Sequence, residues 1–331
     1  MLSRVANSLY WLSRYLERAE NLARLVEVNR YDSLDSSSRI SKASETEEIW
    51  GPLLTATSMQ AAYSESKDPE VGWFLTFSEN NPDSIRQCIA QARENARMVR
   101  DQISEELWRE LNRFHLFIRS EQAEALWQDQ PETFHRRTIE FCMLLSGLTN
   151  ATILHDEGWH FIQVGKFLER ADKTTRVLDM LAYQGEAQRN KLASALKSCS
   201  AFSAFQQEFR GAITLDNSMA FLLFSQSFPR SVRFCMHQLD EHLHAISATK
   251  SGSFSNEAER LTGSALAQLN FSSISNVLQI GYHPYIDALQ QQFNHIGQQI
   301  FETYILLPSE IRSLQQNTTQ HWQFQQQQQQ Q

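Results

Sequence analysis

The sequence contains few residues that break helices. Its 331 residues include 11 glycines and 7 prolines, fewer than the ~7% and ~5% usual in globular proteins. Such a chain has few tight turns, which disfavours folds built from many short strands. Because 41% of the residues are hydrophobic, the chain can still bury a large core. These properties predict an all-α protein.

Other features that are absent exclude several classes of protein. The net charge is −8, and lysines and arginines alternate with acids, so no basic stripe is available to hold nucleic acid. The longest apolar run, residues 141–148, is too short to cross a bilayer, and the amphipathic N-terminal segment resembles neither a signal peptide nor a membrane span. We therefore expect a cytoplasmic protein without a nucleic-acid or membrane partner.

Common motifs for nucleotide binding, hydrolysis and zinc binding are also missing. The sequence contains neither G-x-G-x-x-G nor G-x-x-x-x-G-K-S/T, and no G-x-S-x-G. Its four cysteines are far apart and form no C-x-x-C pair, which argues against a zinc site and fits reduced thiols. Cys88 and Cys235 lie on apolar helix faces, so we expect them to be unreactive packing residues.

Two blocks of the sequence occur twice. Residues 74–91 and 221–238 share nine of eighteen positions, including Pro82/Pro229 and Cys88/Cys235. The tetrapeptide Leu-Glu-Arg-Ala occurs at 16–19 and again at 168–171. Since both blocks recur in the same order and at nearly the same offset, we predict two pseudo-symmetric repeats of about 150 residues. The expected organisation is a first helical repeat at 1–150, a second at 151–310 packed on it as one globular unit, and a disordered Gln-rich tail at 311–331.

Periodic apolar residues predict long helices in both repeats. Asn81-Pro82 is a typical helix start, and the apolar spacing continues to about residue 112, which predicts one long helix. Phe228-Pro229 opens the matching helix in the second repeat. The other expected helices cover about 2–30, 45–62, 132–153, 157–183, 188–208, 255–278 and 284–305.

The repeated Glu-Arg pairs lie away from the apolar stripe of their helices. One explanation is a solvent-exposed helix face with i, i+4 ion pairs between Glu20 and Arg24 and between Asp172 and Arg176. Each such pair would stabilise its helix by only ~0.2–0.5 kcal/mol. Alternatively, the two helices meet near a two-fold axis and bury a shared polar centre, which is either an ion-pair clasp or a pocket for an amino or carboxylate group. The candidate binding residues are Glu17, Arg18, Arg24, Glu169, Arg170 and Arg176.

A titratable cluster precedes the second Glu-Arg helix. His155 and Asp156 either cap this helix or join the polar pocket as further binding candidates. Glu157 and His160 have the Glu-x-x-His spacing of metal sites in helical bundles, so a divalent metal is the one cofactor to consider. The equivalent residues of the first repeat, Val5 and Ser8, cannot bind a metal, and a histidine at the edge of a core is commoner than a ligand.

Four ordered segments resemble the alpha-E family, bacterial all-helical proteins named for their ER motif. They are "MLSRVANSLYWLSRYLERAENLARLVEVN", "NPDSIRQCIAQARENARMVRD", "HDEGWHFIQVGKFLERADKTTRVLD" and "FPRSVRFCMHQL". The resemblance extends over residues 1–310 and places the ER motif on Glu17-Arg18 and Glu169-Arg170. Members of that family are typically encoded beside ATP-grasp ligases and transglutaminase-like peptidases. The resemblance therefore implies partners of these two kinds and a role in peptide or amide-bond synthesis or modification.

Three functions are compatible with these residues. The first is an accessory component that works with an ATP-grasp-type ligase, which supplies ATP and metal, while the Glu/Arg centre organises the substrate. The second is a helical-bundle enzyme that uses the same carboxylates as acid and base, or a metal at Glu157 and His160. The third is a non-catalytic scaffold whose ER pairs are structural. No catalytic mechanism follows from the sequence.

Overall fold

The protein is all-α throughout the part that the structure describes. The computed structural model describes residues 1–36, 49–183, 189–210 and 212–306, and every regular element in these ranges is a helix. This confirms the prediction of an all-α protein. The tail predicted at 311–331 lies outside the described residues.

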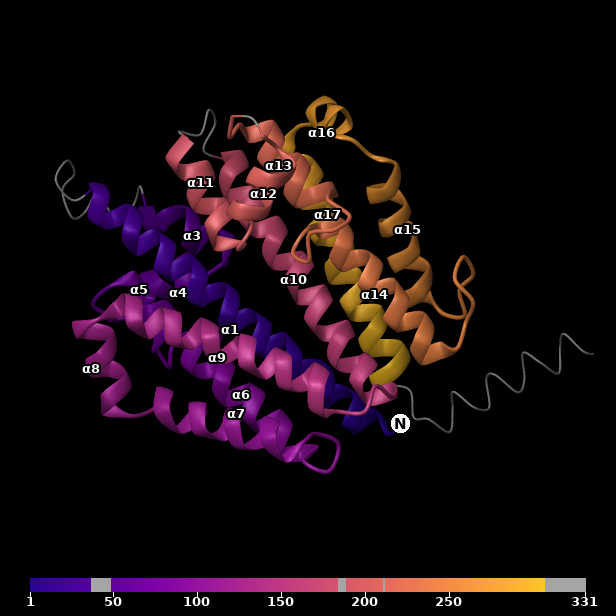
Figure 1. The fold of residues 1–331 in the computed structure, drawn as a ribbon, viewed down its shortest axis with the longest axis horizontal. Coiled ribbons are helices and arrows are strands. Elements are labelled where there is room, and N and C mark those ends of the chain that lie inside the picture. The colour runs from indigo at the N-terminus through magenta and orange to yellow at the C-terminus, as the bar shows by residue number, and fades with distance from the viewer. Residues whose placement is uncertain (37–48, 184–188, 211, 307–331) are drawn as a thin grey trace, which may run out of the picture.

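Two long helices cross at the centre of the molecule (Figure 1). They are α1 (Ser3–Ser36) and α10 (Glu157–Tyr183), which carry the two ER motifs. On one side α1 packs against α6 (Ile85–Met98) and α9 (Pro131–Thr152). On the other side α10 packs against α14 (Val232–Ser247) and α17 (Tyr282–Ile300). Each motif helix thus packs mainly against helices that are near it in the sequence.

Shorter helices complete the two groups. Those before α10 in the chain are α3 (Gly51–Ala56), α4 (Gln60–Glu65), α5 (Val71–Thr76), α7 (Glu105–Ile118) and α8 (Glu121–Asp129). Those after it are α11 (Arg189–Ser198), α12 (Phe202–Glu208), α13 (Leu215–Phe224), α15 (Glu257–Phe271), α16 (Ile274–Ile280) and the π-helical turn η2 (Phe301–Leu306). The two groups interlock, because α3 packs against α10, and α11 and η2 pack against α1.

A glycine allows α1 and α10 to approach closely. A Cβ atom at Gly165 of α10 would collide with the carbonyl oxygen of Tyr10 and the hydroxyl of Ser13, both on α1. Only a residue without a side chain fits between the two backbones at this point. The contact sets the distance at which the motif helices cross.

Serine caps, rather than the Asn81-Pro82 step, start the two matching helices. The hydroxyl of Ser84 accepts from the backbone N–H of Gln87 and caps α6, and Ser231 caps α14 in the same way. Asn81 instead accepts from the backbone N–H of Asp83 and stabilises the preceding turn. The predicted start was therefore about three residues too early.

The single helix predicted from 82 to about 112 is wrong. The chain leaves the helical conformation at Val99, and Ser104 caps a new helix, α7, by accepting from the N–H of Leu107. Both helices keep the apolar spacing, which is why periodicity alone joined them. The segments predicted at 188–208 and 255–278 are likewise divided, into α11 and α12 and into α15 and α16, and Ser200 takes a left-handed conformation at the first break.

The four cysteines are buried and unpaired, as expected for packing residues. Burial raises the pKa of Cys88, Cys199 and Cys235 to about 12, so these thiols stay protonated at neutral pH. Within the described ranges, no helix is both long enough and apolar enough to cross a membrane.

Candidate functional site

The two ER motifs bind each other across the α1–α10 crossing. Arg170 donates from Nε and Nη2 to the two carboxylate oxygens of Glu17, at 2.7 and 2.9 Å. In return, Arg18 donates from Nε and Nη2 to Glu169, at 2.7 and 3.3 Å. Glu17 is 5% exposed and Glu169 is 0% exposed. We call these four residues the ER clasp. The interpretation of the motif as part of a solvent-exposed helix face is wrong.

Further charged side chains surround each glutamate of the clasp. Glu169 also accepts from Nε of Arg14 at 2.7 Å and lies 3.4 Å from Nζ of Lys173. Glu17 also accepts from Arg230 at 3.1 Å. Burial would raise the pKa of Glu17, but Arg170 and Arg230 lower it to about 2. In the same way, Arg14, Lys173 and Arg18 outweigh burial and hold the pKa of Glu169 well below its usual value. Both carboxylates are therefore ionised at neutral pH.

Two residues that sequence reasoning missed complete the clasp. Asp83 accepts from Arg18, while Arg230 donates to both Glu17 and Glu20. Asp83 directly follows Pro82 and Arg230 directly follows Pro229 in the two similar blocks. The sequence signal that could have identified these two residues is that they occupy matching positions with opposite charges. Each side chain pairs with a motif residue of the opposite charge.

The predicted i, i+4 pairs are formed, but they are not solvated. Arg24 donates to Glu20 at 2.8 and 3.0 Å, and Arg176 donates to Asp172 at 2.8 Å. Both acids are buried. Arg24 also lies 3.6 Å from the sulfur of Met143 on α9, and Arg176 donates to the carbonyl of Ala56 at the end of α3. The pairs thus connect the motif helices to neighbouring helices.

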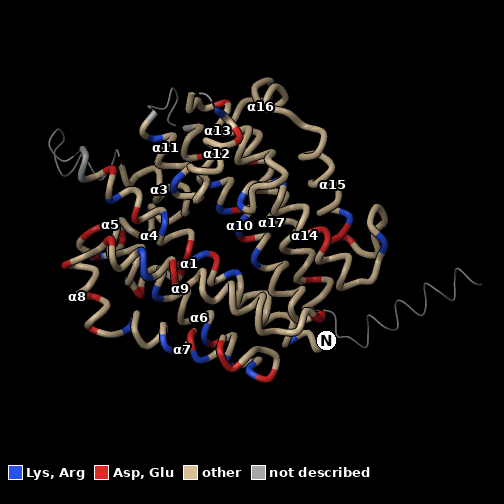
Figure 2. The backbone as a smooth tube through the Cα atoms, in the orientation of Figure 1, with Lys and Arg blue, Asp and Glu red and all other residues tan. Residues whose placement is uncertain are grey.

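Positive charge exceeds negative charge around the crossing, where Figure 2 shows both signs along α1 and α10. Eight cations lie there against five carboxylates. The cations are Arg14, Arg18, Arg24, Lys166, Arg170, Lys173, Arg176 and Arg230, and the acids are Glu17, Glu20, Asp83, Glu169 and Asp172. An uncompensated buried charge is costly, so this surplus favours an anionic ligand.

A cavity of about 270 Å³ is lined by Arg14, Arg18 and Lys173, the three cations that contact Glu169, and we call it the polar cavity. Its walls come from α1, α10, α17, the turn between α3 and α4, and the turn before α6. The turn between α3 and α4 includes Ser58, which takes the left-handed conformation that non-glycine residues seldom adopt. The lining residues are Arg14, Arg18, Thr57, Ser58, Met59, Asp83, Leu168, Asp172, Lys173, Arg176, Phe293 and Asn294.

One buried oxygen in this wall has no hydrogen-bond partner among the described residues. It is Oδ1 of Asp172, whose other carboxylate oxygen accepts from Arg176 at 2.8 Å and from Lys173 at 3.1 Å. Burial would raise the pKa of Asp172, but Lys173 and Arg176 lower it. An ionised oxygen without a donor is suited to accept from an ammonium or hydroxyl group of a ligand.

A second cavity, of about 260 Å³, adjoins the polar cavity, and we call it the aromatic cavity. The two share Arg14, Phe293 and Asn294. The other lining residues are Tyr10, Trp11, Gly297, Gln298 and Phe301. The guanidinium of Arg14 lies over the ring of Trp11, 4.9 Å from its centroid. Together the two cavities reach the ~300–1,000 Å³ typical of small-molecule sites.

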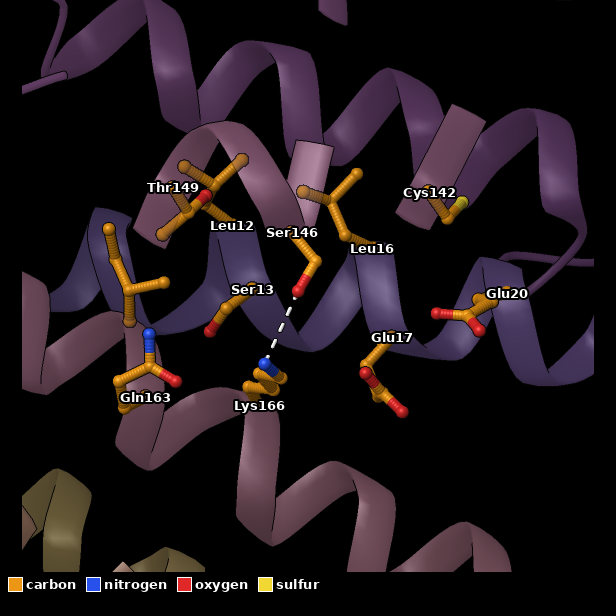
Figure 3. A pocket seen from close by; sticks show the side chains of 11 residues that line it. Leu12, Ser13, Leu16, Glu17, Glu20, Cys142, Ser146, Thr149, Gln163 and Lys166 are labelled. Carbon is orange, nitrogen blue, oxygen red and sulfur yellow. Dashed lines mark hydrogen bonds between the residues drawn. The ribbon is translucent and has the colours of Figure 1, made fainter. Parts of the chain in front are cut away.

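A third cavity, of about 30 Å³, lies between α1, α9 and α10 (Figure 3). Its walls include Leu12, Leu16 and Ile162, and its polar end contains Glu17, Glu20 and Lys166. Nζ of Lys166 donates to the hydroxyl of Ser146 at 3.2 Å. We call it the Lys166 cavity.

His155 and Asp156 lie at the beginning of α10, away from the clasp. Oδ1 of Asp156 accepts from the backbone N–H groups of Gly158 and Trp159, at 2.9 and 3.3 Å, so it caps the helix. The ring of His155 stacks on Trp159 with centroids 3.9 Å apart. At 1.5 Å per residue, Asp156 is about 20 Å along the helix from Arg170. The structure favours capping over a role in the polar pocket.

Glu157 and His160 have different partners. Glu157 accepts from the amino group of Met1 at 2.8 Å, whereas Nδ1 of His160 is 3.0 Å from Nδ1 of His242. Within the described part of the chain, no group of three or more His, Cys, Asp or Glu residues is arranged to hold a metal ion. His135 is a buried core residue, and burial lowers its pKa to about 3.

Comparison with known proteins connects this architecture to a family. The Alpha-E model, described as a predicted alpha-helical domain with a conserved ER motif, matches residues 1–305. Uncharacterized proteins of Mycobacterium bovis and Mycobacterium tuberculosis are 25% identical to this chain over 272 residues. The match covers 76% of this chain and 30% of each relative, so this chain corresponds to less than a third of their length. No solved structure matches the chain.

Proposed function

This chain belongs to the Alpha-E family, and we propose that it binds an amino acid or short peptide as the accessory component of an ATP-grasp-type ligase. The ligase supplies ATP and metal, and the reaction makes or modifies a peptide or amide bond. A transglutaminase-like peptidase is the second partner. Both partners rest on the family resemblance, and the binding role rests on the polar cavity.

The lining of the polar cavity carries this proposal. Four cations and two carboxylates face it. Arg14 and Arg176 each donate through Nε and Nη1, which leaves Nη2 of each without a hydrogen-bond partner among the described residues. Each remaining Nη2 group can donate a charge-assisted hydrogen bond to an oxygen of a ligand carboxylate. The unpartnered oxygen of Asp172 then receives the amino group of the same ligand.

The aromatic cavity accounts for the rest of the ligand. It begins at Arg14, which contacts both cavities, and continues along Trp11, Phe293 and Phe301. A ligand that places its charged groups against Arg14 and Asp172 directs its side chain toward these rings. Aromatic surfaces gain most from apolar or aromatic groups. The favoured ligand is therefore a peptide or amino acid with a large apolar side chain.

The ER clasp itself supports a structural role, which favours the scaffold as the second candidate function. Its two glutamates and two arginines bind each other, so few of their donors and acceptors remain for a ligand. In the leading proposal, the clasp holds α1 and α10 together, and neighbouring residues such as Arg14, Asp172 and Arg176 contact the substrate.

We also propose that the two repeats, 1–150 and 151–310, arose by duplication and pack as one unit. The reciprocal pairs of the clasp support this, because an exchange of identical contacts is what a two-fold axis produces. The equivalent serine caps at Ser84 and Ser231 support it further.

Calorimetry with a ligand panel tests the binding role. The panel contains dipeptides with aromatic, aliphatic and small side chains, each also with an acetylated amine or an amidated carboxylate. We expect binding of the free aromatic dipeptides and at least tenfold weaker binding when either end is blocked. Absence of saturable binding across the panel would remove the proposal and leave the scaffold.

Arg176 and Arg24 form a matched pair of variants. Each arginine forms an i, i+4 ion pair on an ER helix, but only Arg176 lines the polar cavity. Arg176→Gln should weaken ligand binding about tenfold or more, while Arg24→Gln should leave it unchanged. Equal losses in the two variants would mean that stability, rather than contact with the ligand, controls binding. Assay of the co-purified ligase with and without this chain then tests the accessory role.

A further inference from the structure

The boundary between the polar cavity and the aromatic cavity contains one side chain that can both donate and accept a hydrogen bond. Arg14, Phe293 and Asn294 line both cavities. Arg14 can only donate, and Phe293 offers an apolar ring, whereas the carboxamide of Asn294 has two N–H donors and an acceptor oxygen. The uncharged polar group of a ligand that lies at this boundary therefore meets Asn294.

The carboxamide of Asn294 has no hydrogen-bond partner among the described residues. Asparagines within a helix often bond to their own backbone. In this chain, Asn21, Asn29 and Asn95 each donate to the carbonyl oxygen four residues earlier, at 2.8 Å. Asn294 lies inside α17, where the carbonyl of Gln290 occupies that position, yet it makes no such bond. Both its oxygen and its nitrogen are thus available to a ligand.

We infer that the site selects a dipeptide over a free amino acid, and that Asn294 is the specificity-determining residue, because it binds the peptide group of the ligand. The inference rests on the proposed function, in which Arg14 and Asp172 bind the two charged ends. A peptide group offers one N–H donor and one C=O acceptor, and a carboxamide can bond to either of them. A free amino acid with an apolar side chain has no uncharged polar group to place against Asn294.

The order of the lining residues places the peptide group at Asn294. Asp172 lines only the polar cavity, and Trp11 lines only the aromatic cavity. A dipeptide with its amine at Asp172 and its C-terminal side chain at Trp11 has its peptide group between these two ends. Asn294 lies there, because it lines both cavities. In a free amino acid the amine and the side chain are attached to the same carbon atom, so no further group separates them.

The size of the two cavities also favours a dipeptide. Their volumes of about 270 and 260 Å³ together hold roughly 18 non-hydrogen atoms, at ~30 Å³ for each water-sized group. Free phenylalanine has about a dozen such atoms and would leave about a third of this space to water, whereas alanyl-phenylalanine has about seventeen. A small N-terminal residue and a large apolar C-terminal residue thus fit the polar and the aromatic cavity.

Calorimetry of the full chain with alanyl-phenylalanine and with free phenylalanine tests the inference. We expect the dipeptide to bind at least tenfold more tightly, because it gains the bond to Asn294 and fills more of the cavities. Asn294→Leu, which keeps the shape but has no polar atom, should weaken dipeptide binding about fivefold and should not weaken phenylalanine binding. The matched control Asn95→Leu, on an exposed part of α6 outside both cavities, should change neither affinity.

The ester analogue of the dipeptide, in which oxygen replaces the peptide N–H, gives a test that does not depend on the folding of a variant. It should bind the unaltered chain several-fold more weakly than alanyl-phenylalanine, because an ester has no N–H and is a weaker acceptor. Equal binding of ester and dipeptide, or equal binding of phenylalanine and dipeptide, would overturn the role of Asn294 and leave the proposed function standing. Absence of binding by all three ligands would overturn both.

Discussion

Neutralising one glutamate of the ER clasp should destabilise the protein strongly. Glu169 is completely buried and lies 2.7 Å from Arg14, 2.7 Å from Arg18 and 3.4 Å from Lys173. At an effective dielectric constant of 20, each such pair gains about 4 kcal/mol in Coulomb energy, much of which offsets desolvation. Glu169→Gln retains the shape but removes the carboxylate that three partly buried cations share: Arg18 keeps Asp83 and Lys173 keeps Asp172, whereas Arg14 loses its acidic partner. Removing one partner of a buried pair typically costs ~3–5 kcal/mol, and we expect a loss in that range.

Urea and thermal unfolding measure this loss. Since ~1 kcal/mol lowers the melting temperature of a large domain by ~2–4 °C, Glu169→Gln should melt at least about 6 °C lower. The double variant Arg18→Gln/Glu169→Gln should recover ~0.5–3 kcal/mol relative to the sum of the single variants, because it removes a charge of each sign. Glu257→Gln, in an exposed pair with Arg260, is the control and should not change the melting temperature measurably. A Glu169→Gln variant as stable as this control would refute the reasoning.

Three further predictions concern pH, packing and capping. The pKa values of Glu17, Glu169 and Asp172 are lowered in the folded chain, so below about pH 4.5 the unfolded chain binds more protons than the folded chain. The free energy of unfolding should therefore decrease as the pH falls from about 4.5 toward 2. A free energy of unfolding that does not change over this range would contradict the prediction. Gly165→Ala should prevent the normal approach of α1 and α10, and it should lower the free energy of unfolding by several kcal/mol or abolish folding. Gly147→Ala is the control and should be tolerated, because a Cβ atom there meets no atom within 4 Å. Thermal melts followed by circular dichroism compare the two variants. Ser84→Ala should cost ~1 kcal/mol in urea unfolding, and Ser84→Thr, which can still cap, should restore most of it.

The fold class and the central helices were predictable because they depend on local patterns. Low glycine and proline content indicated helices, and the apolar spacing located the whole of α10 and the start of α1, whose end was predicted six residues too early. The break between α6 and α7 was not visible in the spacing, because the apolar residues continue on the same period through Val99. What divides the two helices is the side chain of Ser104, which competes as a cap.

The candidate site was only partly predictable. Glu17, Arg18, Glu169 and Arg170 could be brought together by assuming that the motif helices meet, and they do contact each other. The cavities could not be predicted, because their walls combine α1 and α10 with distant segments. Thr57, Ser58 and Met59 come from a short turn and Phe293 from α17, and nothing in either local pattern indicates proximity to Arg14.

The exchanged pairing of the ER clasp has a consequence for how the molecule opens. Neither glutamate is bound by the arginine of its own motif, so α1 cannot separate from α10 without exposing unbalanced charge on both helices at once. The backbone amides near the crossing should then exchange with solvent at one common free energy, as a single cooperative unit. The clasp thereby couples the opening of α1 to the opening of α10.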